Sequence, residues 1–244
     1  MKRHNVRRLL ALVLVAALCL LCGAAAQPNA TEIHIYSADD LVQLSKSCKL
    51  DTYSQGKTVY LDNDVDLSGS DFVPIPTFGG MFEGQGHTVS GLELSGDASH
   101  MGLFRYVQAV GTVRDLKITG NIDAAGTLNE IGAVVGTNYG TISGCSFNGT
   151  ISGENNVGGI AGAMGMEAGA DPESDVSQSL STTERKQYEL RAVLQRCVST
   201  GAVTAKKDCA AAICGRMDLG LIDGCEAYGS AESQSGDYAG GVAG

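Results

Sequence analysis

Apolar side chains recur along most of the chain in short blocks separated by glycine. One block follows the pattern aliphatic-x-x-Φ-x-Φ-x-Gly, where Φ is apolar, so that apolar and polar positions alternate as they do along a strand. It occurs as VSGLELSG from Val89, VRDLKITG from Val113, ISGCSFNG from Ile142, LQRCVSTG from Leu194 and IDGCEAYG from Ile222. The start positions differ by 24, 29, 52 and 28 residues, which indicates an internal repeat.

A second, glycine-rich block precedes most copies of the first. It reads GGMFEG at Gly79, MGLFRY at Met101, IGAVVG at Ile131, VGGIAG at Val157, AAAICG at Ala210 and AGGVAG at Ala239. A single copy cannot bury its own apolar residues, but stacked copies can, if equivalent residues lie above one another about 4.8 Å apart. The repeat therefore predicts an all-β fold, a parallel β-solenoid, with glycines at corners that need positive φ or close backbone contact.

The alignment predicts three inward-facing columns of side chains. They are Val89/Val113/Ile142/Leu194/Ile222, Leu92/Leu116/Cys145/Cys197/Cys225 and Leu94/Ile118/Phe147/Ser199/Ala227. Cysteine replaces leucine in the second column, so we interpret its cysteines as small buried apolar residues. A disulfide between Cys197 and Cys225 is the alternative, because stacked Cα atoms lie within bridging distance. Cys214 aligns with apolar positions of the glycine-rich blocks, whereas Cys48 and Cys209 have no predicted place.

Two longer stretches resemble a known repeat family. VGTNYGTISGCSFNGTISGENNVGGIAG closely follows the GLUG repeat, and VYLDNDVDLSGSDFVPIPTFGGMFEGQGHTVSGLELSG resembles the segment that often precedes GLUG repeats in exported bacterial proteins. The resemblance covers residues 58–162 well and 194–244 loosely, and CAAAICGRMDLG lacks the family's Asn-x-Gly. It implies a right-handed β-helix on a bacterial surface. It implies no single activity, since the repeat occurs in adhesin-like proteins and beside peptidase domains.

Residues 1–26 have the features of a secretory signal peptide. MKRHNVRR is a basic n-region, LLALVLVAALCLLC is an apolar h-region, and GAAAQ offers cleavage after Ala26. The apolar run of about 14 residues is short for a membrane span. A retained signal anchor and lipoprotein processing at Cys22 are alternatives. We expect a secreted or cell-surface protein, in which the six remaining cysteines would by default form disulfides.

Signal cleavage removes four basic residues and no acidic one, so the net charge changes from −10 to −14. This charge argues against nucleic acid or an anionic membrane as a partner, because both attract a basic face. It suits a soluble surface protein, or one that collects cations. An extracellular protein or a glycan is the expected partner.

The remaining segments suggest a cap, an insertion and an open end. Residues 36–48 predict a short helix with Ser37 as N-cap and Asp40 at the third position, within an N-terminal cap over 27–58. The solenoid would then span 59–244, with an insertion at about 163–190 that either binds a partner or is a tolerated surface excursion. STTERKQYELRAV, in and just beyond it, predicts a helix. The chain ends inside a repeat block, so we expect further domains after Gly244.

Asp62, Asp64 and Asp66 alternate in LDNDVDLSGSD and would share one face of a strand. With Asp71 nearby, these carboxylates could hold Ca²⁺, the one cofactor the sequence suggests. An EF-hand does not fit, because Leu67 replaces the required glycine. The alternative is a solvated outer face.

Catalytic residues are not predicted. Glu93, Asp115 and Lys117 are expected to face outward but stand isolated, without the paired carboxylates of glycosidases. His34, His87 and His100 lack zinc spacing. The leading hypothesis is a structural or adhesive surface module. The alternatives are a polysaccharide-acting β-helix lyase or hydrolase, and a non-catalytic segment of a larger exported enzyme.

Overall fold

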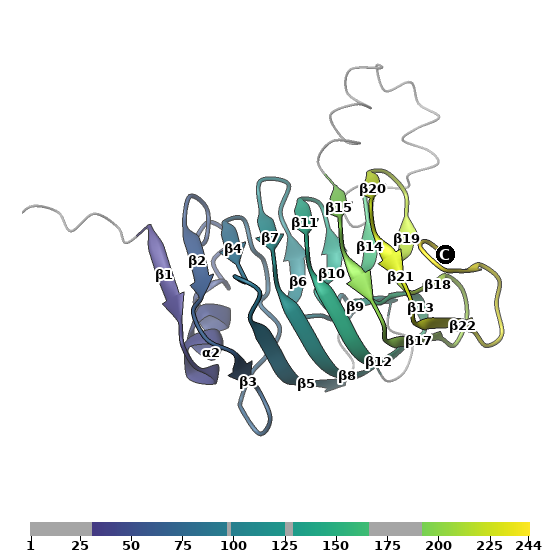
Figure 1. Ribbon diagram of the computed structural model, residues 1–244, viewed down its shortest axis with the longest axis horizontal. Helices are drawn as coiled ribbons and strands as arrows, with labels where there is room; N and C mark the ends of the chain where they lie inside the picture. Colours follow the sequence, from purple (N-terminus) through teal and green to yellow (C-terminus); the bar gives the residue numbers. More distant parts are fainter. Residues whose placement is uncertain (1–30, 97–98, 125–128, 166–191) are drawn as a thin grey trace, which may run out of the picture. The chain divides into compact units, whose positions relative to one another are not determined.

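The repeat folds into four parallel sheets that share one core (Figure 1). The computed structural model describes residues 31–96, 99–124, 129–165 and 192–244. Sheet A contains β1 (Glu32–Ile35), β2 (Thr58–Leu61), β4 (Met81–Glu83), β7 (Thr112–Arg114), β11 (Thr141–Ser143), β15 (Val193–Gln195) and β20 (Leu221–Asp223). Sheet B contains β3 (Val65–Asp66), β5 (Thr88–Gly96), β8 (Lys117–Ala124), β12 (Ser146–Gly153), β16 (Val198–Ser199), β17 (Ala202–Ala205), β21 (Glu226–Ala227) and β22 (Ser230–Ser233).

The two smaller sheets complete each turn of the chain. Sheet C contains β6 (Phe104–Val107), β10 (Val135–Asn138), β14 (Ala161–Met164) and β19 (Cys214–Met217). Sheet D contains β9 (Asn129–Gly132), β13 (Asn155–Gly158), β18 (Ala210–Ala211) and β23 (Ala239–Gly240). One turn, or rung, runs through sheets A, B, D and C, as β7, β8, β9 and β10 do before β11 starts the next.

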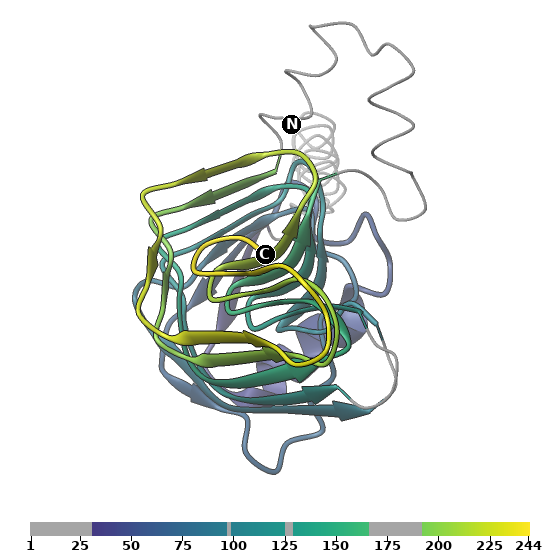
Figure 2. The same ribbon diagram turned by 90° about the vertical axis from the view of Figure 1, so that its right-hand side faces the viewer.

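The fold is the predicted right-handed parallel β-helix. Neighbouring rungs pair in parallel, as β7 does with β11 and β8 with β12. Seen from its C-terminal end, the chain winds counterclockwise toward the viewer, which defines a right-handed helix (Figure 2). Parallel strands joined by a crossover adopt this hand almost without exception, because right-twisted strands pack back onto the sheet only that way.

Two of the predicted columns are confirmed in four of their five copies. Val113, Ile142, Leu194 and Ile222 lie in register in sheet A, and Ile118, Phe147, Ser199 and Ala227 do so in sheet B.

The first copy of the repeat was placed in the wrong register. Val89 pairs with Ile118 rather than aligning with Val113, whose partner is Phe82. The reason is that the corner between sheets A and B precedes this copy, at residues 84–87. VSGLELSG therefore lies wholly in sheet B as β5, with a register shift between Val89 and Leu92.

The corner between sheets A and B repeats a left-handed residue in five successive rungs. These residues are Gln85, Asp115, Gly144, Arg196 and Gly224, with φ of 53°, 52°, 63°, 51° and 60°. The prediction of positive-φ corners is therefore correct, although three corners use a residue other than glycine. Each of those three costs about 1–2 kcal/mol, which the stacked neighbours must offset.

The glycine-rich blocks form the tight arch between sheets D and C. A Cβ atom at Gly162 in β14 would lie 2.2 Å from the backbone of Glu130, and one at Gly215 in β19 would lie 2.4 Å from the backbone of Asn156. Real Cβ atoms do not approach this closely, so the arch brings the two strands together backbone to backbone. These glycines therefore determine shape rather than chemistry.

The core changes in character along the stack. Phe78, Phe82 and Phe104 meet in its N-terminal half, with ring centroids 5.2–6.2 Å apart. Farther along, Cys145 and Cys197 are fully buried, as the filler interpretation predicted, whereas Cys225, which it also expected to be buried, is only half-buried. Cys214 pairs with Ala161, which pairs with Val135, also as predicted. The cysteines in the described part are free thiols, so Cys197 and Cys225 are not bridged in this structure.

Ser199 introduces a polar group into the apolar column of Ile118 and Phe147. Its side chain is fully buried, and its hydroxyl has no hydrogen-bond partner among the described residues. An unpaired buried hydroxyl costs about 1–3 kcal/mol. We expect Ser199→Ala to raise the free energy of unfolding by about 1 kcal/mol in chemical denaturation. Ser152→Ala, at a hydroxyl that bonds Asp123 on the outer face, is the control and should not stabilise the chain.

The N-terminal helix is as predicted. α2 (Ala38–Ser47) begins after Ser37, whose hydroxyl accepts from the Asp40 N–H, while Asp40 accepts from the backbone N–H of Tyr36. Leu41 and Leu44 are buried in the core. The parallel stack itself starts earlier than the predicted boundary at 58, because β1 already pairs with β2.

The predicted signal peptide and most of the predicted insertion lie outside the described residues, as do residues 181–191 of the helix predicted from Ser181. The end of that prediction is wrong, because Val193 begins β15. The described residues Ala163 and Met164 belong to β14. Among the described residues, no helix is both long and apolar enough to cross a membrane.

Candidate functional site

The outer face of sheet B presents polar side chains in register over several rungs. In β8, Ile118 and Ile122 point into the core, so the alternating residues Lys117, Asn121 and Asp123 point outward. In-register partners in β12 are Ser146, Thr150 and Ser152. Because the rungs are in register, the outward side chains of successive strands form columns that run along the stack.

Hydrogen bonds between rungs fix parts of these columns. The Thr150 hydroxyl donates to Oδ1 of Asn121 at 2.8 Å, and the Ser152 hydroxyl donates to Oδ1 of Asp123 at 2.5 Å. The side chains are thereby ordered before any partner binds, which lowers the entropic cost of association.

A column of glycines bends the face. A Cβ at Gly149 would lie 1.9 Å from the carbonyl oxygen of Gly120, and one at Gly229 would lie 1.8 Å from that of Gly201. A hollow of about 330 Å³ lies on one side, with Lys117, Asn148 and Thr200 among its lining residues. A second hollow of about 200 Å³ lies on the other side, lined by Glu93, Leu94, Ser95, Asn121 and Asp123.

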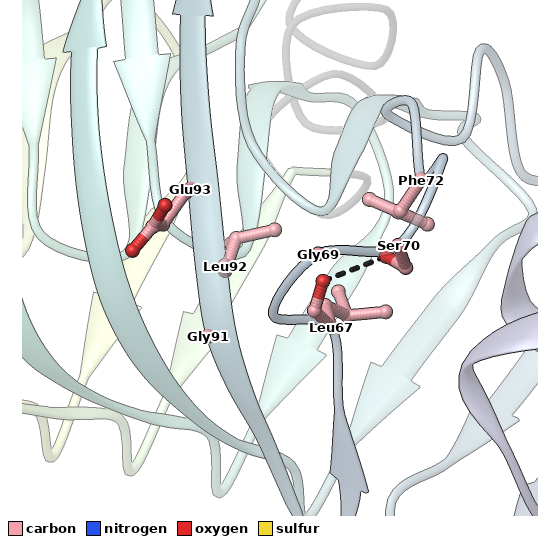
Figure 3. A pocket seen from close by; sticks show the side chains of 7 residues that line it. All are labelled: Leu67, Gly69, Ser70, Phe72, Gly91, Leu92 and Glu93. Atoms are coloured by element: carbon pink, nitrogen blue, oxygen red, sulfur yellow. Dashed lines mark hydrogen bonds between the residues drawn. The ribbon is translucent and has the colours of Figure 1, made fainter.

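A third hollow of about 200 Å³ lies where β3 ends and a loop leaves sheet B (Figure 3). Its wall consists of Leu67, Gly69, Ser70 and Phe72 from the loop and of Gly91, Leu92 and Glu93 from β5. The Ser70 hydroxyl donates to the carbonyl oxygen of Leu67 at 2.7 Å, which closes the loop. Glu93 lines both this hollow and the second one, so the two are neighbours on one face.

The chemistry available on this face is hydrogen bonding to hydroxyl or amide groups. Hydroxyls and amides provide donors and acceptors, and Glu93 and Asp123 provide anionic acceptors. The sequence indicated Glu93 as outward but missed Ser70 and Phe72, because their loop has no repeat period. Only the fold brings that loop beside β5.

The three aspartates predicted to bind Ca²⁺ each bond to a different neighbour. Asp62 bonds to His34 Nδ1 at 2.6 Å and accepts from Gln85, while Asp64 bonds to His87 Nδ1 at 3.1 Å. Asp66 accepts from the backbone N–H of Ser68. Within the described ranges, no group of three or more His, Cys, Asp or Glu side chains surrounds a possible metal position. The Ca²⁺ site stays a prediction, and these contacts do not bring its three carboxylates to one point.

The contacts of Asp64 predict that the stability of this part of the fold decreases in acid. Hydrogen bonds from the Thr88 N–H and from His87 lower the pKa of Asp64 below 3.8. A carboxyl with a lowered folded pKa stabilises the fold above the unfolded value and loses this effect as pH falls through the folded value. We expect Asp64→Asn to be less stable than wild type at pH 6. The gap should close as the pH drops below 3.8 in urea unfolding at several pH values.

Asp71, an exposed carboxyl with no predicted role beyond nearness to the Ca²⁺ site, provides the control for that experiment. Asp71→Asn should change stability little at either pH. A gap between Asp64→Asn and wild type that is constant with pH would contradict the assigned hydrogen bonds.

The isolated outward residues stay apart in the structure. Asp115 occupies a left-handed corner, Lys117 lies in register with Thr88 and Ser146, and Glu93 lies in register with Asn121. None of these contacts supplies a pair of catalytic carboxylates.

The three histidines in the described part of the chain are bound to neighbouring side chains. His34 and His87 bond to aspartates, as described above. His100 bonds to Thr137 at 2.9 Å and lies 3.7 Å from Glu130. Burial lowers the pKa of His100, against the opposing charge of Glu130.

Comparison with known proteins supports the fold and leaves the family open. No protein-family model matches the chain, so the likeness to GLUG repeats stays a prediction. The chain is 30% identical over 151 residues to halomucin of Haloquadratum walsbyi, which is 56% of this chain but 2% of halomucin.

A solved structure also resembles the fold. It is a crystal structure from Bacteroides ovatus described as "a putative immunoglobulin A1 protease", with a TM-score of 0.58 and 19% identity. The match covers 86% of this chain and 61% of that one. At this identity the likeness establishes the β-helix alone.

Proposed function

We propose that this chain is a β-helical structural and interaction module of a secreted or cell-surface protein. The observation that supports this best is the outer face of sheet B, where polar columns run along successive rungs beside three hollows. Repeat folds commonly bind partners through such extended faces. The expected partner is an extracellular protein or glycan.

An extracellular location is supported from two directions. The sequence begins with a segment of signal-peptide character, and the chain has 27 acidic against 17 basic residues. The similarity to halomucin, a protein named as a mucin, also favours an extracellular place. Protease treatment of intact cells should degrade the chain while cytoplasmic proteins survive, and protection of the chain until lysis would contradict this location.

The interaction role is tested by immobilising the full chain and measuring which molecules it retains. We expect a panel of extracellular proteins and glycans to contain a ligand whose binding falls at least about tenfold in Asn148→Lys, which places a bulky cation in the largest of the three hollows. Ser143→Lys, on sheet A, is the matched control and should bind normally. Equal loss in both variants, or no ligand in the panel, would argue against this face.

A second candidate is a non-catalytic segment of a larger exported enzyme. It is favoured by the fold shared with the B. ovatus protein, of which the match covers 61%. Peptidase or polysaccharide turnover by the complete natural protein, retained when the β-helix is removed, would support this candidate. Turnover by the β-helix alone would instead support a lyase or hydrolase.

A further inference from the structure

A row of three aromatic rings, two of them exposed and the third half-buried, lies at the start of sheet A. His34 in β1 and Tyr60 in β2 are in register, with ring centroids 5.2 Å apart and planes 20° apart. Tyr36 follows His34 on the same face, 6.1 Å away with planes 14° apart. Tyr36 is 57% exposed, and the His34 side chain is 44% exposed.

The surrounding hydrogen bonds hold this row in place. The backbone N–H of Tyr36 donates to Asp40, and its carbonyl oxygen accepts from Asn63. Asp62 bonds to His34 at 2.6 Å and accepts from Gln85 at 3.1 Å. The row is therefore ordered before binding, which reduces the cost of association.

The core does not need these rings. Phe78, Phe82 and Phe104 are buried in it, whereas the three rings of the row do not belong to the core cluster. Aromatic residues make up 5% of the chain, and there is no tryptophan. Three aromatic rings on a solvent-accessible surface suit a partner that has both an apolar face and polar groups, because tyrosine offers an apolar ring and a hydroxyl.

The shape and charge of the row narrow the class of ligand. Rings that recognise a cation surround it, whereas these three are nearly parallel. Among the charged residues that border the row, Glu32, Asp62 and Glu83 are acidic and Arg114, which is paired with Glu83, is basic, so the border is acidic on balance. An anionic polymer would be repelled. A neutral sugar fits, because its C–H face can lie against rings while its hydroxyls bond the carboxylate and phenols.

We propose that Tyr36, His34 and Tyr60 form a binding subsite for a neutral glycan. The subsite adds a second surface to the proposed interaction role and rests on that role. Tyr36 and Tyr60 supply apolar ring surface and hydroxyls, and Asp62 accepts hydrogen bonds at the edge of the row.

The test titrates the full chain with four oligosaccharides: cellohexaose and mannohexaose as neutral probes, hexagalacturonate as an anion and a chitosan hexamer as a cation. Heat and tyrosine fluorescence report binding, since the chain has eight tyrosines and no tryptophan to mask them. We expect a neutral probe to bind. Tyr36→Ala and Tyr60→Ala should each lower its affinity about tenfold, because each removes a ring against which the sugar would lie.

Two controls separate binding from folding. Tyr228→Ala removes a tyrosine that is 71% exposed on the last described rung and should bind normally. Tyr36→Phe retains the ring and should keep most of the affinity. Each variant should match the wild type in circular dichroism and thermal unfolding.

Three results would overturn the subsite: no neutral probe binds, only a charged probe binds, or the Tyr36→Ala and Tyr60→Ala variants bind as wild type does. The interaction role is judged separately. If no neutral probe binds but the wild type still retains a partner on sheet B, the glycan subsite fails and the role stands. If no partner binds the wild type, the role fails as well.

Discussion

Phe104→Ala is expected to lower the free energy of unfolding by about 3–5 kcal/mol, the usual cost of deleting a buried aromatic side chain. Phe104 is fully buried, and its ring lies 5.2 Å from Phe78 and 5.4 Å from Phe82 between centroids. Its truncation would leave a cavity beside the rings of Phe78 and Phe82. Because each rung contacts only its neighbours, we expect the N-terminal half to open first.

Urea denaturation and amide hydrogen exchange measure this effect. Val110→Ala is the control, because Val110 is 71% exposed and its loss should change stability by no more than about 0.5 kcal/mol. Protection should fall mainly in β4, β6 and β7 rather than in β19 to β22. Equal effects of the two variants would mean that the three phenylalanines do not pack together.

Gly162→Val is expected to prevent folding or to cost more than about 3 kcal/mol, because its Cβ would meet the backbone of Glu130 at 2.2 Å and of Ile131 at 2.3 Å. A clash with flexible side chains could be relieved by a rotamer change. A clash with backbone requires the D and C strands to separate, which would break pairing with the rungs on both sides. Gly162→Ala places the same Cβ against the backbone and should also be strongly destabilised, with the two additional methyl groups of valine increasing the loss.

Gly241→Val is the matched control, since a Cβ at Gly241 meets nothing within 4 Å. Soluble yield, circular dichroism and urea denaturation compare the three variants. A stable, wild-type-like Gly162→Val protein would contradict the backbone contact between sheets D and C. Loss of folding in Gly241→Val would instead mean that a side chain in the last glycine-rich block prevents folding even where its Cβ meets no other atom.

The sequence was informative where the structure is periodic. A recurring pattern brings a residue of one rung beside its equivalent in the next, so Val113, Ile142, Leu194 and Ile222 could be aligned without knowing where the chain turns. Helix capping is equally local, and Ser37 with Asp40 predicted the start of α2. Both inferences depend only on nearest neighbours along the chain or along the repeat.

The candidate sites were much less predictable. The alternation of Asp62, Asp64 and Asp66 suggested one shared cation, but each carboxylate meets a different residue. The row of Tyr36, His34 and Tyr60 was missed. Its signal is weak: two aromatic residues two positions apart, and a third near one repeat length later.

The sequence by itself determined the all-β repeat, the inward columns of the later rungs, the positive-φ corners and the N-terminal helix. Only the tertiary structure decided the register of the first copy, the contact of sheets D and C through glycine, and the hollow between the loop at Ser70 and β5. The physical reason is that a corner can shift by a few residues without changing the apolar pattern. Which side chains meet across rungs then depends on where each corner falls.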